Sequence, residues 1–224
     1  RIQNSKIAIG DNLDTSAPDY AGWQTQHEKF SDKETNYAFN LGLNKYLSMN
    51  KSIYGRMGTG FRYPNIDDRI GGSGDTLLDL NTQKTEDLEI GCKFINEIFK
   101  SNFSYYLIQG KNELGYDSDG FVNININSTR RYGFEMDFEL KINSKLNLSN
   151  NFTYAKAKYT SGNQGSYATD FKGNDVPLVP EYSFDSELEY KLSKFTNFVT
   201  RLNYQDDMRM ESDDENFQNT KIPS

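Results

Sequence analysis

Carboxylates occupy every second position in two stretches of the chain, and their spacing is the first feature that could support chemistry. They are Glu135, Asp137, Glu139, Asp185, Glu187 and Glu189. Two carboxylates at a suitable separation can hydrolyse a glycosidic bond. The alternative is that they form the polar face of a sheet that lines water, where charged side chains are ordinary. We favour the polar face, because each acid alternates with an apolar residue.

Other motifs that could bind a metal or a phosphate are incomplete. Asp117-Ser118-Asp119-Gly120 begins like a calcium loop, but the flanking residues do not supply the remaining ligands, so we interpret it as a polar turn. The glycine-rich residues 71–74 lack the Gly-Lys-Ser/Thr ending of a phosphate loop. A single histidine, His27, and a single cysteine, Cys92, leave little for a zinc site or a catalytic triad. We expect no metal site and no cofactor.

The acids are carried by strands. In residues 129–140, aromatic and aliphatic side chains alternate with Gly133 and three acids, so the two kinds fall on opposite faces of a strand. Similar segments recur along the chain, and we expect about nine strands of roughly 9–14 residues, long enough to cross a bilayer at a tilt. They are residues 1–9, 33–43, 52–61, 84–94, 101–109, 129–140, 146–159, 182–190 and 196–204.

Short and long connections alternate between these strands. The long ones are residues 11–32, 62–83, 111–128, 161–176 and 205–219. Within the third long connection, residues 121–127 alternate well enough to extend a strand beyond the membrane. We interpret the acidic residues in 211–215, within the fifth, as a solvated loop tip. Strands of this kind with unequal connections indicate a transmembrane β-barrel that has short periplasmic turns and long extracellular loops.

Composition agrees with a barrel and excludes other classes. No run of about 20 apolar residues is present, which excludes a transmembrane helix. The formal net charge is −7 with scattered basic residues, which argues against nucleic acid as a partner. The chain opens on Arg1 and closes on Ser224 just after a loop, so we expect it to be part of a longer protein.

Five short motifs, in order, resemble the TonB-dependent outer-membrane receptor family. They are Gly60-Phe61-Arg62-Tyr63-Pro64 at a strand end, Glu89-Ile90-Gly91, Arg131-Tyr132-Gly133-Phe134-Glu135, Tyr154-Ala155-Lys156-Ala157 and Val176-Pro177-Leu178-Val179-Pro180. The resemblance covers nearly all of the chain from Lys33 onward. It implies an all-β, antiparallel barrel of about 22 strands with a plugged lumen, of which residues 1–224 supply about nine to ten strands of one partial domain. The plug, the TonB-box segment and the last strands are not in this sequence.

If a ligand is bound, the resemblance places its site at the tops of the strands and in the long loops. Guanidinium groups recognise carboxylate and catecholate oxygens, and tyrosine adds a flat face and a hydroxyl. We therefore predict ligand contacts at Arg62, Tyr63, Arg69, Tyr116, Arg130 and Arg131. The competing interpretations are that Arg62 closes a strand end and that Arg130 and Arg131 pair with neighbouring acids.

The function implied is TonB-coupled uptake of a scarce nutrient across a bacterial outer membrane, without chemistry on the ligand. The ligand would be a small molecule or metal chelate, such as a ferric siderophore, haem, cobalamin or an oligosaccharide. Other partners would be outer-membrane lipid and TonB, the latter through the plug segment. The alternatives are a passive porin, a small barrel hydrolase that depends on His27, and a soluble β-sandwich adhesin.

Overall fold

The computed structural model describes residues 2–8, 31–69, 78–117, 120–126, 128–161, 171–211, 213–217 and 221–222. Strands dominate this part of the chain, with one four-residue helix, α1 (Ile66–Arg69). The strands are β1 (Ile2–Ala8), β2 (Ser31–Tyr37), β3 (Phe39–Ser48), β4 (Lys51–Arg62), β5 (Gln83–Ile95), β6 (Phe99–Lys111), β7 (Glu113–Asp117), β8 (Val122–Ile126), β9 (Thr129–Lys141), β10 (Leu146–Tyr159), β11 (Tyr182–Lys191) and β12 (Asn197–Gln205). The all-β expectation is confirmed.

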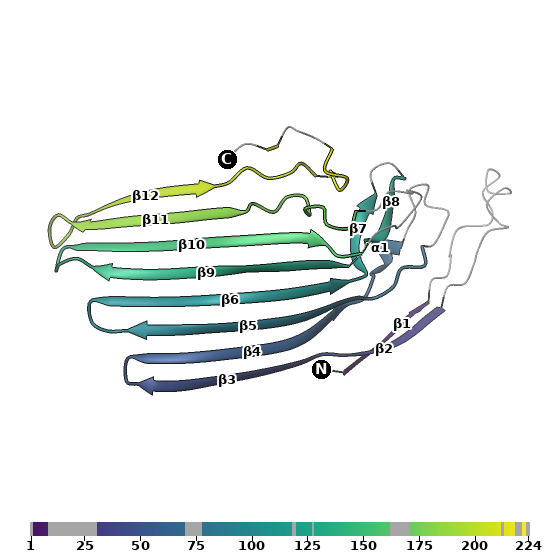
Figure 1. Ribbon diagram of the computed structural model, residues 1–224, viewed down its shortest axis with the longest axis horizontal. Helices are drawn as coiled ribbons and strands as arrows, with labels where there is room; N and C mark the ends of the chain where they lie inside the picture. Colours follow the sequence, from purple (N-terminus) through teal and green to yellow (C-terminus); the bar gives the residue numbers. More distant parts are fainter. Residues whose placement is uncertain are drawn as a thin grey trace, which may run out of the picture.

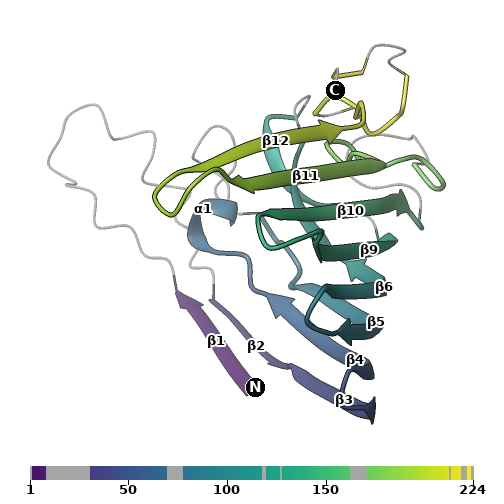
Figure 2. The same ribbon diagram turned by 90° about the vertical axis from the view of Figure 1, so that its left-hand side faces the viewer.

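Eight strands form one antiparallel sheet in the order β12-β11-β10-β9-β6-β5-β4-β3. Figure 1 shows the tight turns at one end of this sheet and the longer connections at the other; we call these the short-turn end and the long-loop end. At the long-loop end, β2 leads into β3 after the break at Ala38 and pairs with β1. The sheet is curved and open, so the barrel is not closed within this chain (Figure 2).

The register separates two chemically different faces. Phe134 of β9 lies between Tyr105 of β6 and Tyr154 of β10, whereas its neighbour Glu135 lies between Ser104 and Thr153. We call the side of Phe134 the apolar face and the side of Glu135 the polar face. Aromatic rings contact one another along the apolar face, as in Phe103–Phe134 at 5.9 Å and Phe134–Phe152 at 5.7 Å between ring centroids.

Few hydrophobic side chains are buried. Among the described residues, the buried hydrophobic ones are Leu80, Ala157 and Tyr159, while Leu43 and Leu202 are among many that are exposed. Such a broad apolar surface is unfavourable in water and calls for an apolar neighbour. None of the helices in the described ranges has the length and apolar character to span a membrane.

Two glycines on the polar face are covered by tyrosines from the neighbouring strand. A Cβ atom at Gly91 would overlap the ring of Tyr54, and one at Gly133 would overlap the carbonyl oxygen of Tyr154 and approach the hydroxyl of Tyr106 at 2.8 Å. Each tyrosine stands directly opposite its glycine in the register. The missing side chain therefore leaves the space in which the tyrosine ring packs.

Two segments differ from the expectation. The single strand predicted at residues 33–43 is divided at Ala38 into β2, which pairs with β1, and β3, which belongs to the large sheet. β3 continues to Ser48 because Asn44 and Lys45, although turn-like residues, pair with Tyr54 and Ile53 of β4. The predicted strand extension in residues 121–127 is instead β8, which pairs with β7 in a separate two-stranded sheet. The remaining predicted strands agree with the structure to within about two residues at either end.

Candidate functional site

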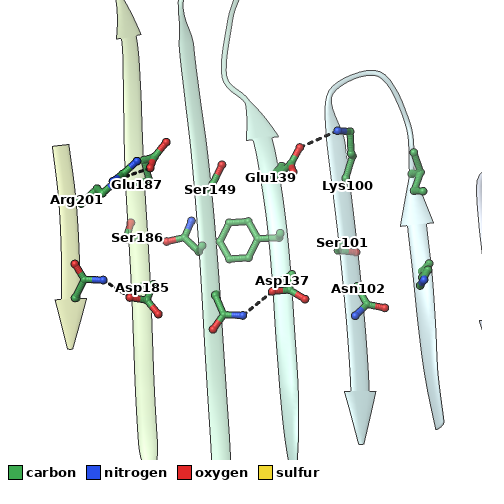
Figure 3. Close-up of a pocket in the computed structure, with 16 residues that line it drawn as sticks. Lys100, Ser101, Asn102, Asp137, Glu139, Ser149, Asp185, Ser186, Glu187 and Arg201 are labelled. Atoms are coloured by element: carbon green, nitrogen blue, oxygen red, sulfur yellow. Dashed lines mark hydrogen bonds and ion pairs between the residues drawn. The ribbon is translucent and has the colours of Figure 1, made fainter. Parts of the chain in front are cut away.

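The polar face carries a row of amides and carboxylates across five adjacent strands at the short-turn end (Figure 3). The register places them side by side in the order Asn102, Asp137, Asn151, Asp185, Asn203. The Asn151 amide donates to Asp137 at 2.6 Å, and the Asn203 amide donates to Asp185. The two acids thus have neutral hydrogen-bond donors beside them, which leaves oxygen atoms free to accept from a further partner.

The adjacent row is internally neutralised. Lys100 lies 2.8 Å from Glu139, and Arg201 lies 2.6 Å from Glu187. These two rows line a cavity of about 660 Å³. No group of three or more metal-ligating side chains occurs in the described ranges. The acids of the two rows contact amides and cations, an arrangement typical of a polar wall that meets water.

At the long-loop end, the β7–β8 hairpin is fastened to the sheet by Glu113. Its carboxylate accepts hydrogen bonds from Arg131 of β9 at 2.6 and 2.8 Å and from the hydroxyl of Thr129. Burial raises the pKa of the Glu113 carboxyl, but the hydrogen bonds and the charge of Arg131 outweigh burial, so that the pKa lies below its ordinary value. Glu113 is therefore held as a carboxylate.

Two asparagines of β8 fasten the other side of the hairpin. The Asn125 side chain accepts from the backbone N–H of Asn81 at 2.6 Å and donates to the carbonyl of the same residue at 2.9 Å. Asn123 donates to the carbonyls of Asp67 and Asp68 in α1. These bonds connect the hairpin to the connection between β4 and β5.

The acidic stretch near the end of the chain is partly packed, which corrects the prediction of a solvated loop tip. Asp213 is buried and accepts from Arg209 at 3.2 Å, and Asp214 accepts a hydrogen bond from the hydroxyl of Tyr159. The Tyr159 ring is 2% exposed. The sequence could not reveal these contacts because Tyr159 lies 55 residues from Asp214.

Three of the predicted ligand residues support the connection between β4 and β5. Arg62 makes two 3.0 Å hydrogen bonds to Asp68, in agreement with the interpretation that Arg62 closes a strand end. Its side chain remains half exposed. Arg69 is 2% exposed and donates to the carbonyl of Leu78 at 3.2 Å. The Tyr63 hydroxyl donates to the carbonyl of Glu34 at 3.3 Å.

The other three predicted residues are separated by the strand geometry. Arg131 lies on the polar face and binds Glu113, while Arg130 alternates with it and lies on the apolar face. Tyr116 is on β7 and is 56% exposed. The structure therefore places Tyr116 and Arg62 at the long-loop end with side chains accessible to a ligand. His27 and residues 71–74 lie outside the described residues.

Glu113, Asn123 and Asn125 were not predicted. The sequence does carry a signal for this hairpin. Residues 113–117 and 122–126 lie on either side of the polar turn at residues 117–120, and two short segments around such a turn indicate a hairpin. In the structure Asp117 accepts from the backbone N–H of Gly120 at 3.1 Å. The interpretation as a polar turn fits this bond.

The sheet, its two faces and its unequal connections can be compared with known proteins. The family model described as TonB dependent receptor-like, beta-barrel, matches residues 9–224. The chain belongs to the TonB-dependent receptor family. It therefore lies in a bacterial outer membrane, and its apolar face is the side that meets lipid.

Comparisons with individual proteins agree with this family assignment. The ferrichrome outer membrane transporter/phage receptor of Escherichia coli K12 is 23% identical over 150 residues, which are 66% of this chain and 17% of the relative. The ferric yersiniabactin uptake receptor of Yersinia pestis superposes with a TM-score of 0.63 at 14% identity, covering 84% of this chain and 28% of the receptor. For the copper transporter OprC the TM-score is 0.65 at 14% identity, covering 79% and 27%. The chain thus spans less than a third of the length of these relatives.

Proposed function

We propose that this chain forms part of the wall of a receptor that imports a metal chelate, such as a ferric siderophore, in a TonB-coupled step. The observation that carries the proposal is the continuous polar face, which runs from the cavity at the short-turn end to the fastened hairpin at the long-loop end. It provides a hydrophilic wall beside which a plug and a passing ligand would lie. Family membership and relatives named for ferrichrome, ferric yersiniabactin and copper support the ligand class.

The ligand contacts would come from Tyr116 and Arg62. The Tyr116 ring is exposed on a hairpin that Glu113 and Asn125 hold in place, so the ring is presented on a rigid support. The Arg62 guanidinium is oriented by Asp68 and still has an exposed edge for a carboxylate or catecholate oxygen. Arg69, Tyr63 and Arg131 would act indirectly, by holding these segments. The chain would do no chemistry on its ligand.

The proposal is tested with the full-length protein that contains this chain. Uptake of radioactive iron as ferrichrome and as ferric yersiniabactin, and of Cu²⁺, would be measured in cells with and without TonB. We expect saturable uptake of at least one of these probes that disappears without TonB. Uptake that persists without TonB and rises linearly with concentration would instead indicate the passive porin. Haem, cobalamin and an oligosaccharide complete the panel, and failure of every probe would reject active import.

Substitutions at Tyr116 then test the contact. Tyr116→Phe keeps the ring and removes the hydroxyl, whereas Tyr116→Ala removes both. If the ring face binds the ligand, Tyr116→Ala weakens binding of the accepted probe about tenfold or more and Tyr116→Phe changes it little. Phe121, which is exposed near the same hairpin turn, provides a matched control as Phe121→Ala. Equal binding by wild type and Tyr116→Ala would remove Tyr116 from the site.

A further inference from the structure

A groove lies at the long-loop end, between the connection from β4 to β5 and strand β8. It has a volume of about 350 Å³ and is bounded by residues 78–81 on one side and 122–125 on the other. Figure 1 shows α1 and the β7–β8 hairpin beside each other at this end of the sheet. The volume is at the small end of the range for ligand pockets, so it suits one arm of a chelate better than a whole chelate.

The two segments that bound the groove are attached on the side of the polar face. Arg62 of β4 binds Asp68 in α1, and Arg131 of β9 binds Glu113 at the start of the hairpin. The register places both arginines on the polar face. A ligand that approaches the polar face from the long-loop end therefore passes the groove.

The residues that line the groove are apolar, amide or acidic, and Asp79 is the one charged side chain among them. Leu78 and Ile124 are half-buried and leave apolar surface open to the groove. The amides of Asn123 and Asn125 already bond to the backbone of neighbouring segments. Asp79 is exposed, and no basic side chain of the described residues lies within ion-pair distance of it. The groove thus combines an apolar surface with an uncompensated carboxylate.

The long connections as a group are acidic. Residues 11–32, 62–83, 111–128, 161–176 and 205–219 carry 20 of the 32 acidic residues of the chain but only six of its 25 basic residues. In the rest of the chain, basic residues outnumber acidic ones, so negative charge is concentrated in these connections. Charge of one sign around a cleft attracts ligands of the opposite sign and raises their local concentration.

Basic side chains in these connections are paired with acids, whereas several acids are not paired with bases. Arg62 binds Asp68, and Arg209 lies 3.2 Å from Asp213. Arg62 can therefore donate a hydrogen bond to a ligand without adding a net positive charge. The acids of the long connections that have no basic group within ion-pair distance in the described part of the chain include Asp67, Asp79, Asp206, Glu211 and Glu215.

We propose that the groove binds the alkylammonium arm of a cationic metal chelate, and that Asp79 is the residue that selects the charge of this arm. The ammonium group lies beside the Asp79 carboxylate, and the methylene chain contacts Leu78 and Ile124. Tyr116 is the register partner of Asn123, which lines the groove, and its exposed ring offers a face that attracts a cation. The inference rests on the proposed function, because it names the class of chelate that the receptor accepts.

The test compares three ferric chelates that differ only in the charge of one arm. Desferrioxamine B ends in a free ammonium group, its N-acetyl derivative ends in a neutral amide, and its N-succinyl derivative ends in a carboxylate. Binding of each radioactive iron complex to the full-length protein in detergent is measured by equilibrium dialysis. We expect the ammonium form to bind about fivefold more tightly than the acetyl form, and the succinyl form to bind least tightly. The preference should shrink as the salt concentration rises, because salt screens the charges.

Substitutions separate the contact at Asp79 from the general negative charge. Asp79→Asn should reduce the preference for the ammonium form to less than about twofold, with little effect on the acetyl form, and Asp79→Glu should restore most of the preference. Glu211→Gln is the matched control, because it removes one exposed acid from the connection after β12, outside the residues that line the groove. This control should keep the preference of the wild type.

Three results would overturn the inference. They are failure of all three chelates to bind, equal binding of the three, and an Asp79→Asn variant that weakens all of them equally or no more than Glu211→Gln does. Import is measured separately, in cells with and without TonB. TonB-dependent import of ferrichrome or Cu²⁺ without any preference for the ammonium form would reject this inference and leave the proposed function. Charge-selective binding without TonB-dependent import would reject the proposed function and leave the groove as a binding site.

Discussion

Glu113 of β7 and Arg131 of β9 form a two-point ion pair that joins a loop hairpin to the main sheet. Glu113 Oε1 lies 2.6 Å from Arg131 Nη1, and Oε2 lies 2.8 Å from Nη2. The Glu113 side chain is largely buried, so its charge is compensated by protein groups more than by water. Planar, bidentate pairs of this kind are among the stronger and more directional contacts available to a protein.

We expect Arg131→Gln to loosen the β7–β8 hairpin by about 1.5–3 kcal/mol, since it leaves a mostly buried carboxylate without its charged donors. The measurement is hydrogen exchange of the β7 and β8 backbone amides in the full-length protein. Arg201→Gln is the control. Arg201 also pairs with an acid, Glu187, at 2.6 Å, but its side chain is 70% exposed. Its replacement should therefore lower stability by no more than about 1 kcal/mol. Equal hairpin protection in wild type and Arg131→Gln would show that Arg131 does not anchor it.

The same anchor should weaken in acid. The pKa of Glu113 is lower in the folded protein than its ordinary value of 4.5, so its stabilising contribution is complete above about pH 4.5. That contribution is lost as the pH falls through the lowered folded pKa, when the carboxylate is protonated. The mobility of a spin label at Tyr116→Cys, with Cys92 replaced by serine, should rise below pH 4.5. When Glu113→Gln is added to this labelled protein, the mobility of the label should be high already at pH 7 and change little with pH. If the label stays as immobile as in the protein that keeps Glu113, Glu113 does not anchor the hairpin.

How far the sequence could be interpreted depended on the range of each interaction. The strand around Phe134 and Glu135 was predictable because alternation is written locally and repeats in neighbouring strands. The contacts of Arg131 with Glu113 and of Asn125 with Asn81 were not, since they join residues 18 and 44 positions apart through side chains that no local pattern pairs. Arg130 is an intermediate case: alternation predicts the face on which it lies, whereas the ligand contact predicted for it rests on residue type alone.

The two faces can be distinguished by placing the same charge at adjacent positions. Met136 lies midway along the apolar face of β9 and is 37% exposed, whereas Glu135 lies on the polar face. Met136→Arg should destabilise the protein by about 2–4 kcal/mol in a bilayer, because the guanidinium would enter hydrocarbon near the midplane. Glu135→Arg should be tolerated in the wet interior. Folding into lipid vesicles as a function of urea gives both values, and equal effects at the two positions would reject the assignment of faces.

Gly133 offers a test of packing on the polar face. A methyl group at this position would overlap the backbone carbonyl of Tyr154, which cannot move without bending β10, and would press against the Tyr106 hydroxyl. Gly133→Ala should therefore destabilise the sheet by about 1–3 kcal/mol, as expected for overpacking. Gly42→Ala is the matched control, because a Cβ there meets its nearest neighbour, the carbonyl of Gly55, at an ordinary 3.9 Å. Thermal unfolding in detergent should show a lowered midpoint for Gly133→Ala only. If both variants have the midpoint of the wild type, the close approach of β9 and β10 does not require glycine at position 133.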